Sequence, residues 1–187
     1  MKFFIKNMVC ARCKMVVEAE FQKAGLTVVH VDLGSVQITD QSLDAERQDG
    51  LEQRLQTLGF SLLTDNKLKD IEQIKTLIIE RVHAGDHALE QNLSAYLANR
   101  LNKDYATLSS TFSQHEPYTI EKYFIRQKIE RVKELLSYDE LNLNEIAFQL
   151  NYSSVAHLSS QFKKITGYTP STFKKSAQNY RLDLDQI

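Results

Sequence analysis

The chain has 187 residues with a net charge of −1, and 42% of them are hydrophobic, which is typical of a globular protein of one large or two small domains. No apolar run approaches the roughly 18 residues that cross a bilayer, and the segment MKFFIKNMVC lacks the cleavage site of a signal peptide. These features predict neither a membrane-spanning helix nor a secretory leader, so we expect a cytoplasmic protein with no membrane partner. The near-zero net charge also argues against a general binder of polyanions.

Residues 1 to about 64 alternate between strand and helix patterns. Aromatic and β-branched residues predict strands at Lys2–Lys6, Leu26–Leu33, Val36–Thr39 and Phe60–Leu63. A helix is predicted between the first two strands, with Gly25 as its C-cap, and a second helix from about Ser42 to Gly59. The order β-α-β-β-α-β predicts a split, ferredoxin-like arrangement.

Beyond residue 66 the strand pattern ends and helical spacing continues to about Ala177. The segment Leu68–Ala84 carries apolar residues at helical spacing, and no Pro/Gly linker precedes it. We therefore predict an α+β chain with a domain at residues 1–66, an all-α domain at residues 67–177 and a tail at residues 178–187. The helix Leu68–Ala84 is expected to belong to the second domain and to hold the two domains at a fairly fixed distance.

The all-α part contains an internal repeat. When the sequence is shifted by 50, the segment from Leu93 aligns without a gap with the segment from Leu143. The triplet Leu108-Ser109-Ser110 falls on Leu158-Ser159-Ser160, Phe112 on Phe162 and Thr119 on Thr169. Each copy contains a short helix, a turn and a second helix, so the repeat predicts two helical pairs of one design.

Local signals place the helices of the second copy. Asn142 and Glu145 have the spacing of a capping box, and Thr169-Pro170 has the pattern of an N-cap followed by proline in the first turn. An apolar stripe at helical spacing runs along the second helix of this copy, through Val155, Leu158, Phe162 and Ile165.

Residues 68–177 resemble the DNA-binding domain of AraC-type transcription regulators. The similarity lies in Ile146-Ala147, Asn151–Ser154, Leu158–Lys164 and Gly167–Lys174. This family usually has Gly where the sequence has Asn151, and Asn is the next best residue at positive φ. The resemblance implies two helix-turn-helix units joined by a long helix at about Ile120–Ser137. That helix would span about 27 Å, on the order of the 34 Å between successive major grooves.

The resemblance also implies recognition helices at about Tyr105–Gln114 and Ser154–Lys164, each with one apolar stripe and one outer face. Positions 106, 110, 156 and 160 coincide with base-contacting positions of the family. Short hydroxyl and methyl side chains suit contact with thymine methyl groups rather than bidentate guanine recognition, so we expect modest sequence discrimination. The residues expected to contact double-stranded DNA are Ala106, Thr107, Ser110, Gln114, Ala156, His157, Ser160, Lys163, Lys164, Lys174 and Lys175.

The second copy also carries a local excess of positive charge. Between Ile146 and Arg181 there are five Lys or Arg residues and no Asp or Glu. Such a segment can follow a phosphate backbone, and Lys163, Lys174 and Lys175 are expected to add phosphate affinity. On charge alone, an ordinary solvated surface explains the pattern equally well.

The two cysteines, Cys10 and Cys13, form a C-x-x-C pair between the first strand and the first helix. In a reducing compartment this spacing favours a metal or redox pair over a structural disulfide. Near a helix N-terminus, the dipole and Arg12 are expected to lower the pKa of the Cys13 thiol. Two thiolates suit Cu(I) in low coordination, or half of a tetrahedral Zn(II) site.

The stretch Met8-Val9-Cys10-Ala11-Arg12-Cys13, together with Gly59-Phe60, resembles heavy-metal-associated domains, the small fold of copper chaperones. The family normally has Gly before its motif Met, where this chain has Asn7. The resemblance implies that Cys10 and Cys13 bind a soft metal ion. Two alternatives stay open: a fold retained for another ligand or partner, and a pair that closes reversibly as a disulfide.

Three hypotheses follow. The first is a transcription regulator whose N-terminal domain senses Cu(I) or Zn(II) and biases DNA binding or contact with RNA polymerase. The second keeps DNA binding but gives the N-terminal domain a role in dimerisation, partner binding or thiol redox sensing. The third, a metal-transfer or thiol-redox protein, leaves the tandem repeat unexplained. No nucleophile–base pair, Gly-rich phosphate loop or carboxylate constellation supports an enzyme. The sequence gives no oligomeric state, operator, or choice between activation and repression.

Overall fold

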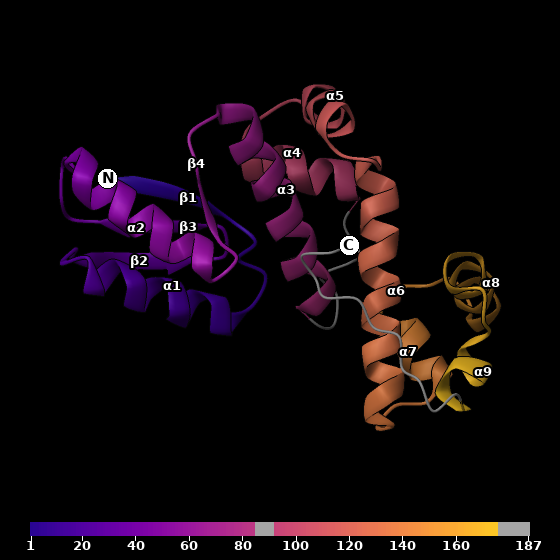
Figure 1. Ribbon diagram of the computed structural model, residues 1–187. Coiled ribbons are helices and arrows are strands. Elements are labelled where there is room, and N and C mark those ends of the chain that lie inside the picture. The colour runs from indigo at the N-terminus through magenta and orange to yellow at the C-terminus, as the bar shows by residue number, and fades with distance from the viewer. Residues whose placement is uncertain (85–91, 176–187) are drawn as a thin grey trace. The chain divides into compact units, whose positions relative to one another are not determined.

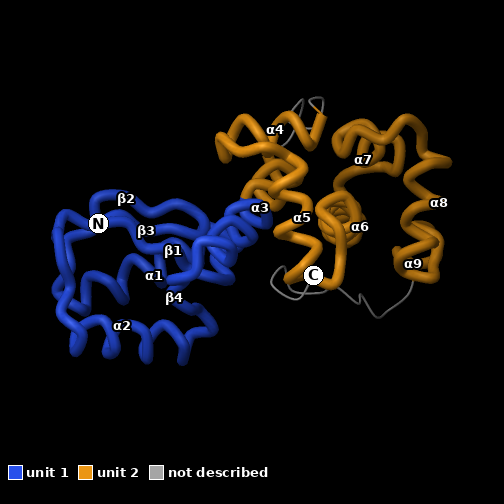
Figure 2. Tube along the Cα trace, turned by 90° about the horizontal axis from the view of Figure 1, so that it is seen from above, with its two compact units in different colours: residues 1–76 blue, residues 77–187 orange. Residues whose placement is uncertain are grey.

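The computed structural model describes residues 1–84 and 92–175, and it divides into two compact units, Met1–Thr76 and Leu77–Ile187 (Figures 1 and 2). The first unit is mixed α and β and the second is helical, as predicted for an α+β chain. The predicted tail, residues 178–187, lies outside the described residues. None of the helices within the described ranges is long and apolar enough to cross a membrane.

The first unit contains a four-stranded sheet and two helices. Its elements are β1 (Lys2–Lys6), α1 (Ala11–Lys23), β2 (Val28–Asp32), β3 (Ser35–Ile38), α2 (Ala45–Thr57) and β4 (Ser61–Leu63). The strand order is β2-β3-β1-β4 with every neighbouring pair antiparallel, and in the central strand Phe3 faces Val36 while Ile5 faces Leu62. The order of elements is the predicted one. Helix α2 begins three residues later than expected because Asp44 caps it by accepting a hydrogen bond from the Arg47 backbone N–H at 2.8 Å.

The core of the first unit fixes the register of these elements. Alternate residues of β1 and β3 and one stripe of each helix meet in a single apolar cluster, as the twofold and 3.6-residue periodicities require. Its fully buried members include Ile5, Val17, Phe21, Leu51 and Leu55. Met8, the residue that opens the C-x-x-C segment, is also fully buried in this cluster and anchors the loop that carries the cysteines.

Helix α3 (Asn66–His83) belongs to both units, because the division falls between Thr76 and Leu77. Its first half packs on the first unit, where Glu72 accepts a hydrogen bond from the Asn7 backbone N–H at 2.8 Å and the Lys69 ammonium lies 5.6 Å from the Phe4 ring centre. The sequence placed the boundary at residue 66, where the strand pattern ends. Periodicity shows where a helix begins but not which core its residues join, which accounts for the ten-residue difference.

The second unit consists of two helical pairs joined by a long helix. Its elements are α4 (Leu93–Leu101), α5 (Tyr105–His115), α6 (Ile120–Tyr138), α7 (Leu143–Gln149), α8 (Val155–Thr166) and α9 (Pro170–Lys175). Helix α6 contacts α5 from the first pair, and both α8 and α9 from the second (Figure 1). At 1.5 Å per residue its 19 residues span about 28 Å, close to the predicted length.

The capping residues confirm the 50-residue repeat. Asn92 and Asn142 cap α4 and α7, Asp104 and Ser154 cap α5 and α8, and Thr119 caps α6 as Thr169 bonds the first turn of α9. Each pair of positions differs by 50, and the predicted capping box of Asn142 with Glu145 is present. Asn151 has a φ of 49°, so it occupies the left-handed conformation expected where the AraC family usually has glycine.

Candidate nucleic-acid interface

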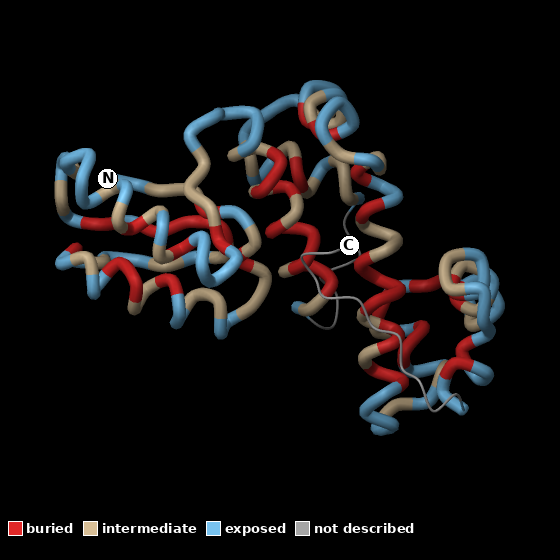
Figure 3. The backbone as a smooth tube through the Cα atoms, viewed as in Figure 1, coloured by how far each residue is buried: buried red, intermediate tan, exposed pale blue. Residues whose placement is uncertain are grey.

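The inner faces of α5 and α8 are buried, which leaves one outer face on each helix. Leu108 and Phe112 of α5 are buried, and so are Leu158 and Phe162 of α8. Each phenylalanine packs against an aromatic ring of the following helix, Phe112 with Tyr123 at 5.8 Å and Phe162 with Phe173 at 5.4 Å between centroids. Because the inner stripe of each helix is fixed in a core, its outer face is presented to solvent (Figure 3).

All eleven residues predicted to contact DNA are exposed. The structure places four of them on α5, five on α8 and two on α9, with none buried beneath another helix. They are Ala106, Thr107, Ser110 and Gln114, then Ala156, His157, Ser160, Lys163 and Lys164, then Lys174 and Lys175.

The outer face of α5 is neutral and partly tied up by its own hydrogen bonds. The Thr107 hydroxyl lies 3.4 Å from the Asp104 carboxylate that caps the helix, and the Gln114 amide donates to the Ser110 hydroxyl at 3.1 Å. Apart from the terminal His115, this helix has no ionisable side chain except the Tyr105 phenol. This face would therefore contact DNA through hydrogen bonds and apolar contacts, with little Coulombic attraction.

The outer face of α8 is basic. Lys163 and Lys164 lie in its last turn, and neither makes an ion pair within residues 1–84 and 92–175. His157 is oriented from two sides, because its Nδ1 lies 3.1 Å from the Ser153 hydroxyl and its ring packs edge-on against Tyr152 at 5.4 Å. This face combines charge that can attract phosphate with one positioned imidazole.

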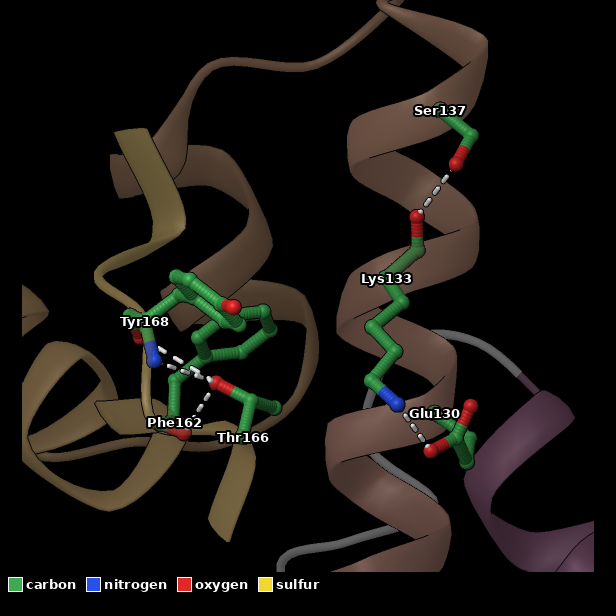
Figure 4. A network of polar contacts seen from close by, with 6 residues as sticks. All are labelled: Glu130, Lys133, Ser137, Phe162, Thr166 and Tyr168. Atoms are coloured by element: carbon green, nitrogen blue, oxygen red, sulfur yellow. Dashed lines mark hydrogen bonds and ion pairs between the residues drawn. The ribbon is translucent and has the colours of Figure 1, made fainter. Parts of the chain in front are cut away.

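The end of α8 is held by a hydrogen-bonded turn (Figure 4). The Thr166 hydroxyl lies 2.8 Å from the Phe162 carbonyl oxygen and 3.1 Å from that of Tyr168, and it accepts a hydrogen bond from the Tyr168 backbone N–H at 3.1 Å. Gly167 follows with a φ of 81°, a conformation that a β-carbon would strain. This turn leads the chain into α9 and so fixes where Lys174 and Lys175 lie.

Lys174 differs from the other lysines of the predicted site. Its ammonium forms an ion pair with Asp139, the left-handed residue that ends α6. Its positive charge is therefore already compensated, whereas the prediction treated it as a free phosphate contact. Asp139 lies 35 residues away in sequence, so the pair arises from the packing of α9 on α6.

Two residues beneath α8 and one on its inner side carried no role in the sequence prediction. Lys128 of α6 is buried, and its ammonium lies 3.7 Å from the centre of the Tyr152 ring. The Tyr152 hydroxyl donates to the side-chain oxygen Oε1 of Gln161, on the inner side of α8, at 2.7 Å. Tyr152 belonged to the AraC-like motif, but neither periodicity nor charge pattern pointed to the lysine beside it.

The cysteine pair lies at the start of α1, where Cys10 is the N-cap and Cys13 is in the first turn. The two sulfur atoms are 3.3 Å apart, and both side chains are half-buried. Burial raises the pKa of both thiols. In Cys10 this is outweighed by hydrogen bonds from Cys13 and the Arg12 backbone and by the Arg12 charge, so its pKa is lowered. The pKa of Cys13 is raised by burial and by its hydrogen bond to Cys10.

The expectation that Cys13 would have the lowered pKa was therefore wrong. The backbone N–H groups of Arg12 and Cys13 favour the thiolate of the N-cap Cys10, whereas Cys13 itself lies three positions later, inside the first turn. The residue before the motif, Asn7, has a φ of 70°, donates its backbone N–H to Glu72 and donates its side-chain amide to the Gly59 carbonyl at 2.9 Å. It thus adopts the conformation that glycine would have there.

The helical half of the chain is similar to known proteins. Residues 97–176 match the family model described as a helix-turn-helix domain. A segment of 83 residues, 44% of this chain, is 29% identical to the Msm operon regulatory protein of Streptococcus mutans and spans 30% of that relative's length. A solved DNA-binding transcriptional dual regulator from Escherichia coli is 17% identical with a TM-score of 0.50, over 60% of this chain and 93% of that one. The solved C-terminal domain of AraT, a response regulator from Geobacillus stearothermophilus, is 19% identical with a TM-score of 0.49, over 61% and 88%.

Residues 97–176 are therefore a helix-turn-helix domain, a class of DNA-binding module and not of enzymes. The matched segment lies within residues 68–177, the part of the sequence that resembles AraC-type DNA-binding domains.

Proposed function

We propose that this protein is a sequence-specific transcription regulator that binds double-stranded DNA through the outer faces of α5 and α8. The observation that carries the proposal is the repeated design of the two helical pairs, whose caps lie 50 residues apart and whose outer faces are both exposed. A connecting helix of about 28 Å suits two recognition helices in successive major grooves. The name of the streptococcal relative, an operon regulatory protein, accords with this function.

Footprinting on duplexes selected from a random-sequence pool tests this function. We expect protection of two half-sites about one helical turn, or 10 base pairs, apart. Lys163→Ala should weaken all bound sites about equally, because a lysine on phosphate contributes affinity without sequence preference. Lys67→Ala, an exposed lysine at the start of α3, is the matched control and should bind as wild type. Protection of a single half-site would contradict the tandem model.

We further propose that the first unit has the ferredoxin-like fold of heavy-metal-associated domains and that a soft metal ion bound by Cys10 and Cys13 controls the regulator. The antiparallel β-α-β-β-α-β order and the position of both thiols at the start of α1 support this. Tetrahedral Zn–S bonds of about 2.3 Å place two sulfurs roughly 3.8 Å apart, so the 3.3 Å pair would open by about half an ångström.

The donor set favours Cu(I) over Zn(II). In the part of the chain that the structure describes, no group of three or more His, Cys, Asp or Glu residues could hold a metal ion, so the set here is a dithiolate. Two soft sulfur ligands satisfy Cu(I) in low coordination, whereas Zn(II) would require further ligands from elsewhere. The metal would supply a charged, sulfur-bound centre at the start of α1, and Asn7, through Glu72, would connect that loop to α3.

Metal titration with and without Cys10→Ser and Cys13→Ser tests this control. We expect wild-type protein purified anaerobically to bind Cu(I) far more tightly than the double variant, and bound metal to change DNA affinity. If the double variant binds the metal equally well, metal sensing is wrong. The N-terminal domain would then serve dimerisation or partner binding, or act as a thiol switch. A thiol switch would be recognised by a DNA affinity that changes on oxidation in wild type but not in the double variant. The regulator's proposed protein partner is RNA polymerase, which in vitro transcription from a selected site tests.

A further inference from the structure

A row of alternating cations and aromatic rings crosses the second unit. The Arg81 guanidinium of α3 lies 4.7 Å from the ring centre of Tyr96 and 5.8 Å from that of Phe124. The Lys128 ammonium lies 5.7 Å from the same Phe124 ring and 3.7 Å from the ring of Tyr152. All four distances are within the range of cation–π attraction. The row therefore connects α4 of the first helical pair, through α3 and α6, to the turn that precedes α8.

Lys128 is the unusual member of this row. It is only 8% exposed, yet it makes no hydrogen bond or ion pair among the residues that the structure describes. Its neighbours on α6 behave differently, since Lys133 pairs with Glu130 at 2.5 Å (Figure 4) and Arg131 pairs with Glu134 at 2.5 Å. A buried cation without a carboxylate is costly, so two aromatic faces are the compensation that this site provides.

Tyr152 connects Lys128 to α8. The Tyr152 hydroxyl donates to the side chain of Gln161, and the Tyr152 ring packs against His157. Because these two residues are four positions apart on α8, Tyr152 contacts two consecutive turns of that helix. His157 belongs to the exposed outer face, and Gln161 is half-buried on the inner side. In the first helical pair, the position 50 residues earlier is Asn102, and the residue that follows the left-handed turn residue is Lys103; neither has a ring. This support is therefore absent from the repeated design and specific to the second pair.

We propose that Lys128, through Tyr152, is a positioning residue for DNA recognition by α8, although it contacts no DNA itself. The inference rests on the proposed DNA-binding function and adds a residue to it. Lys128 holds the Tyr152 ring, and Tyr152 sets the rotation of α8 that presents His157 and Ser160. Loss of the Lys128 charge would leave the fold intact but let α8 rotate or shift, and small displacements of a recognition helix weaken base contacts.

The test uses the full chain and a duplex that wild type has selected from a random-sequence pool. The double variant Lys163→Ala/Lys164→Ala first identifies the half-site contacted by the second pair. Lys128→Met, which keeps the length of the side chain, should then require at least about tenfold more protein to protect that same half-site, a loss of roughly 1.4 kcal/mol. The other half-site should change less than about twofold. Lys128→Arg should retain protection because a guanidinium also stacks on rings.

Two further measurements separate positioning from loss of stability. Thermal unfolding of Lys128→Met should occur at the same or a higher temperature than wild type, because replacing a buried charge by an apolar chain of similar size does not destabilise. Lys122→Met, an exposed lysine on the same helix, is the matched control and should bind as wild type. Equal loss at both half-sites together with a lower unfolding temperature would overturn the proposal, and so would wild-type protection by Lys128→Met. Failure of wild type to bind any duplex would instead refute the DNA-binding function.

A pH profile gives an independent measurement. Burial lowers the pKa of Lys128 to about 8, with a smaller contribution from Arg81. The groups that face it are Arg81 from α3, Phe124 from its own helix and Tyr152 from the turn, and burial raises the pKa of Tyr152, which stays neutral. Protection of the second half-site should therefore fall between pH 7 and pH 9 in wild type, as Lys128 loses its proton. In Lys128→Met the same protection should not vary over this range, and a parallel fall in both proteins would contradict the proposal.

Discussion

The two helical pairs of the second unit share a backbone design and differ in charge and support. Their caps, their inner apolar stripes and their buried phenylalanines correspond at a spacing of 50 residues. The outer face of α5 has no charge before His115, whereas α8 ends in two lysines that make no ion pair with any residue the structure describes, and Tyr152 hydrogen-bonds to its inner side. One framework therefore supports two outer faces of different charge. We expect the second pair to supply most of the electrostatic affinity.

The largest effect should come from the residues that the two pairs have in common. Phe112 and Phe162 are both fully buried, and each packs on an aromatic partner. Phe112→Ala and Phe162→Ala should each lower the free energy of unfolding by about 3–5 kcal/mol, because a large cavity replaces a ring. Denaturant unfolding measures this loss. Phe148→Ala, a change at an exposed ring, is the control and should cost little unfolding free energy. A much smaller loss for one buried ring than for the other would show that the two helical pairs do not have equally stable cores.

The sequence predicts a structural feature well when the residues that determine it lie close together in the chain. Caps and apolar periodicity depend on neighbours within a few residues, so the starts of α7 and α9 could be predicted from the residues themselves, while the AraC-type resemblance implied the starts of α5, α6 and α8 and the left-handed Asn151. The stacking of Lys128 on Tyr152 and the pairing of Lys174 with Asp139 join residues 24 and 35 positions apart, counting 152 − 128 and 174 − 139. Only tertiary packing brings such residues together, and no pattern in one sequence encodes it.

The same distinction explains the candidate thiol site. The C-x-x-C spacing placed both cysteines at a helix start, and the structure has them there. The pKa of each thiol depends on the N–H groups near its sulfur. These groups differ between two positions of the same helical turn, so the spacing alone did not predict which thiol has the lowered pKa. The first half of α3 is joined to the first unit by contacts such as the Asn7–Glu72 hydrogen bond, which links residues 65 positions apart and which local patterns do not predict.

The next effect should separate the two outer faces. The double variant Lys163→Ala/Lys164→Ala should weaken DNA binding roughly tenfold at moderate salt and reduce the slope of log affinity against log salt by about 1.8, since each phosphate contact contributes about 0.9. Ser110→Ala/Gln114→Ala on α5 should leave that slope unchanged, because it removes no charge. Filter binding or fluorescence titration over a salt series measures both. Equal slopes for the two double variants would contradict the division of charge between the pairs.

A smaller effect should distinguish the first helices of the two pairs. Asn142 caps α7 with a full capping box, in which Glu145 also bonds back to the Asn142 backbone N–H at 2.7 Å, whereas Asn92 caps α4 through its own side chain and the Ser94 backbone N–H. Asn142→Ala should cost about 1–2 kcal/mol of unfolding free energy and Asn92→Ala about 1 kcal/mol or less. The measurement is denaturant unfolding at fixed salt. Asn144→Ala, a change at an exposed residue two positions further on in the first turn of α7, is the control. A larger cost at Asn92 than at Asn142 would show that the number of capping hydrogen bonds does not determine the cost of losing the cap.

The smallest effect should lie within α9, between two adjacent lysines. Lys175 makes no ion pair in the described ranges, whereas Lys174 is already compensated by Asp139. Lys175→Ala should weaken DNA binding a few-fold, and Lys174→Ala less, because an exposed ion pair is worth at most about 1 kcal/mol and its net charge is near zero. Asp139→Asn should have the opposite sign: it frees Lys174, so affinity should rise slightly and the salt slope should steepen. If Lys174→Ala instead weakens binding more than Lys175→Ala, then the ion pair opens on DNA and Lys174 is itself a phosphate contact.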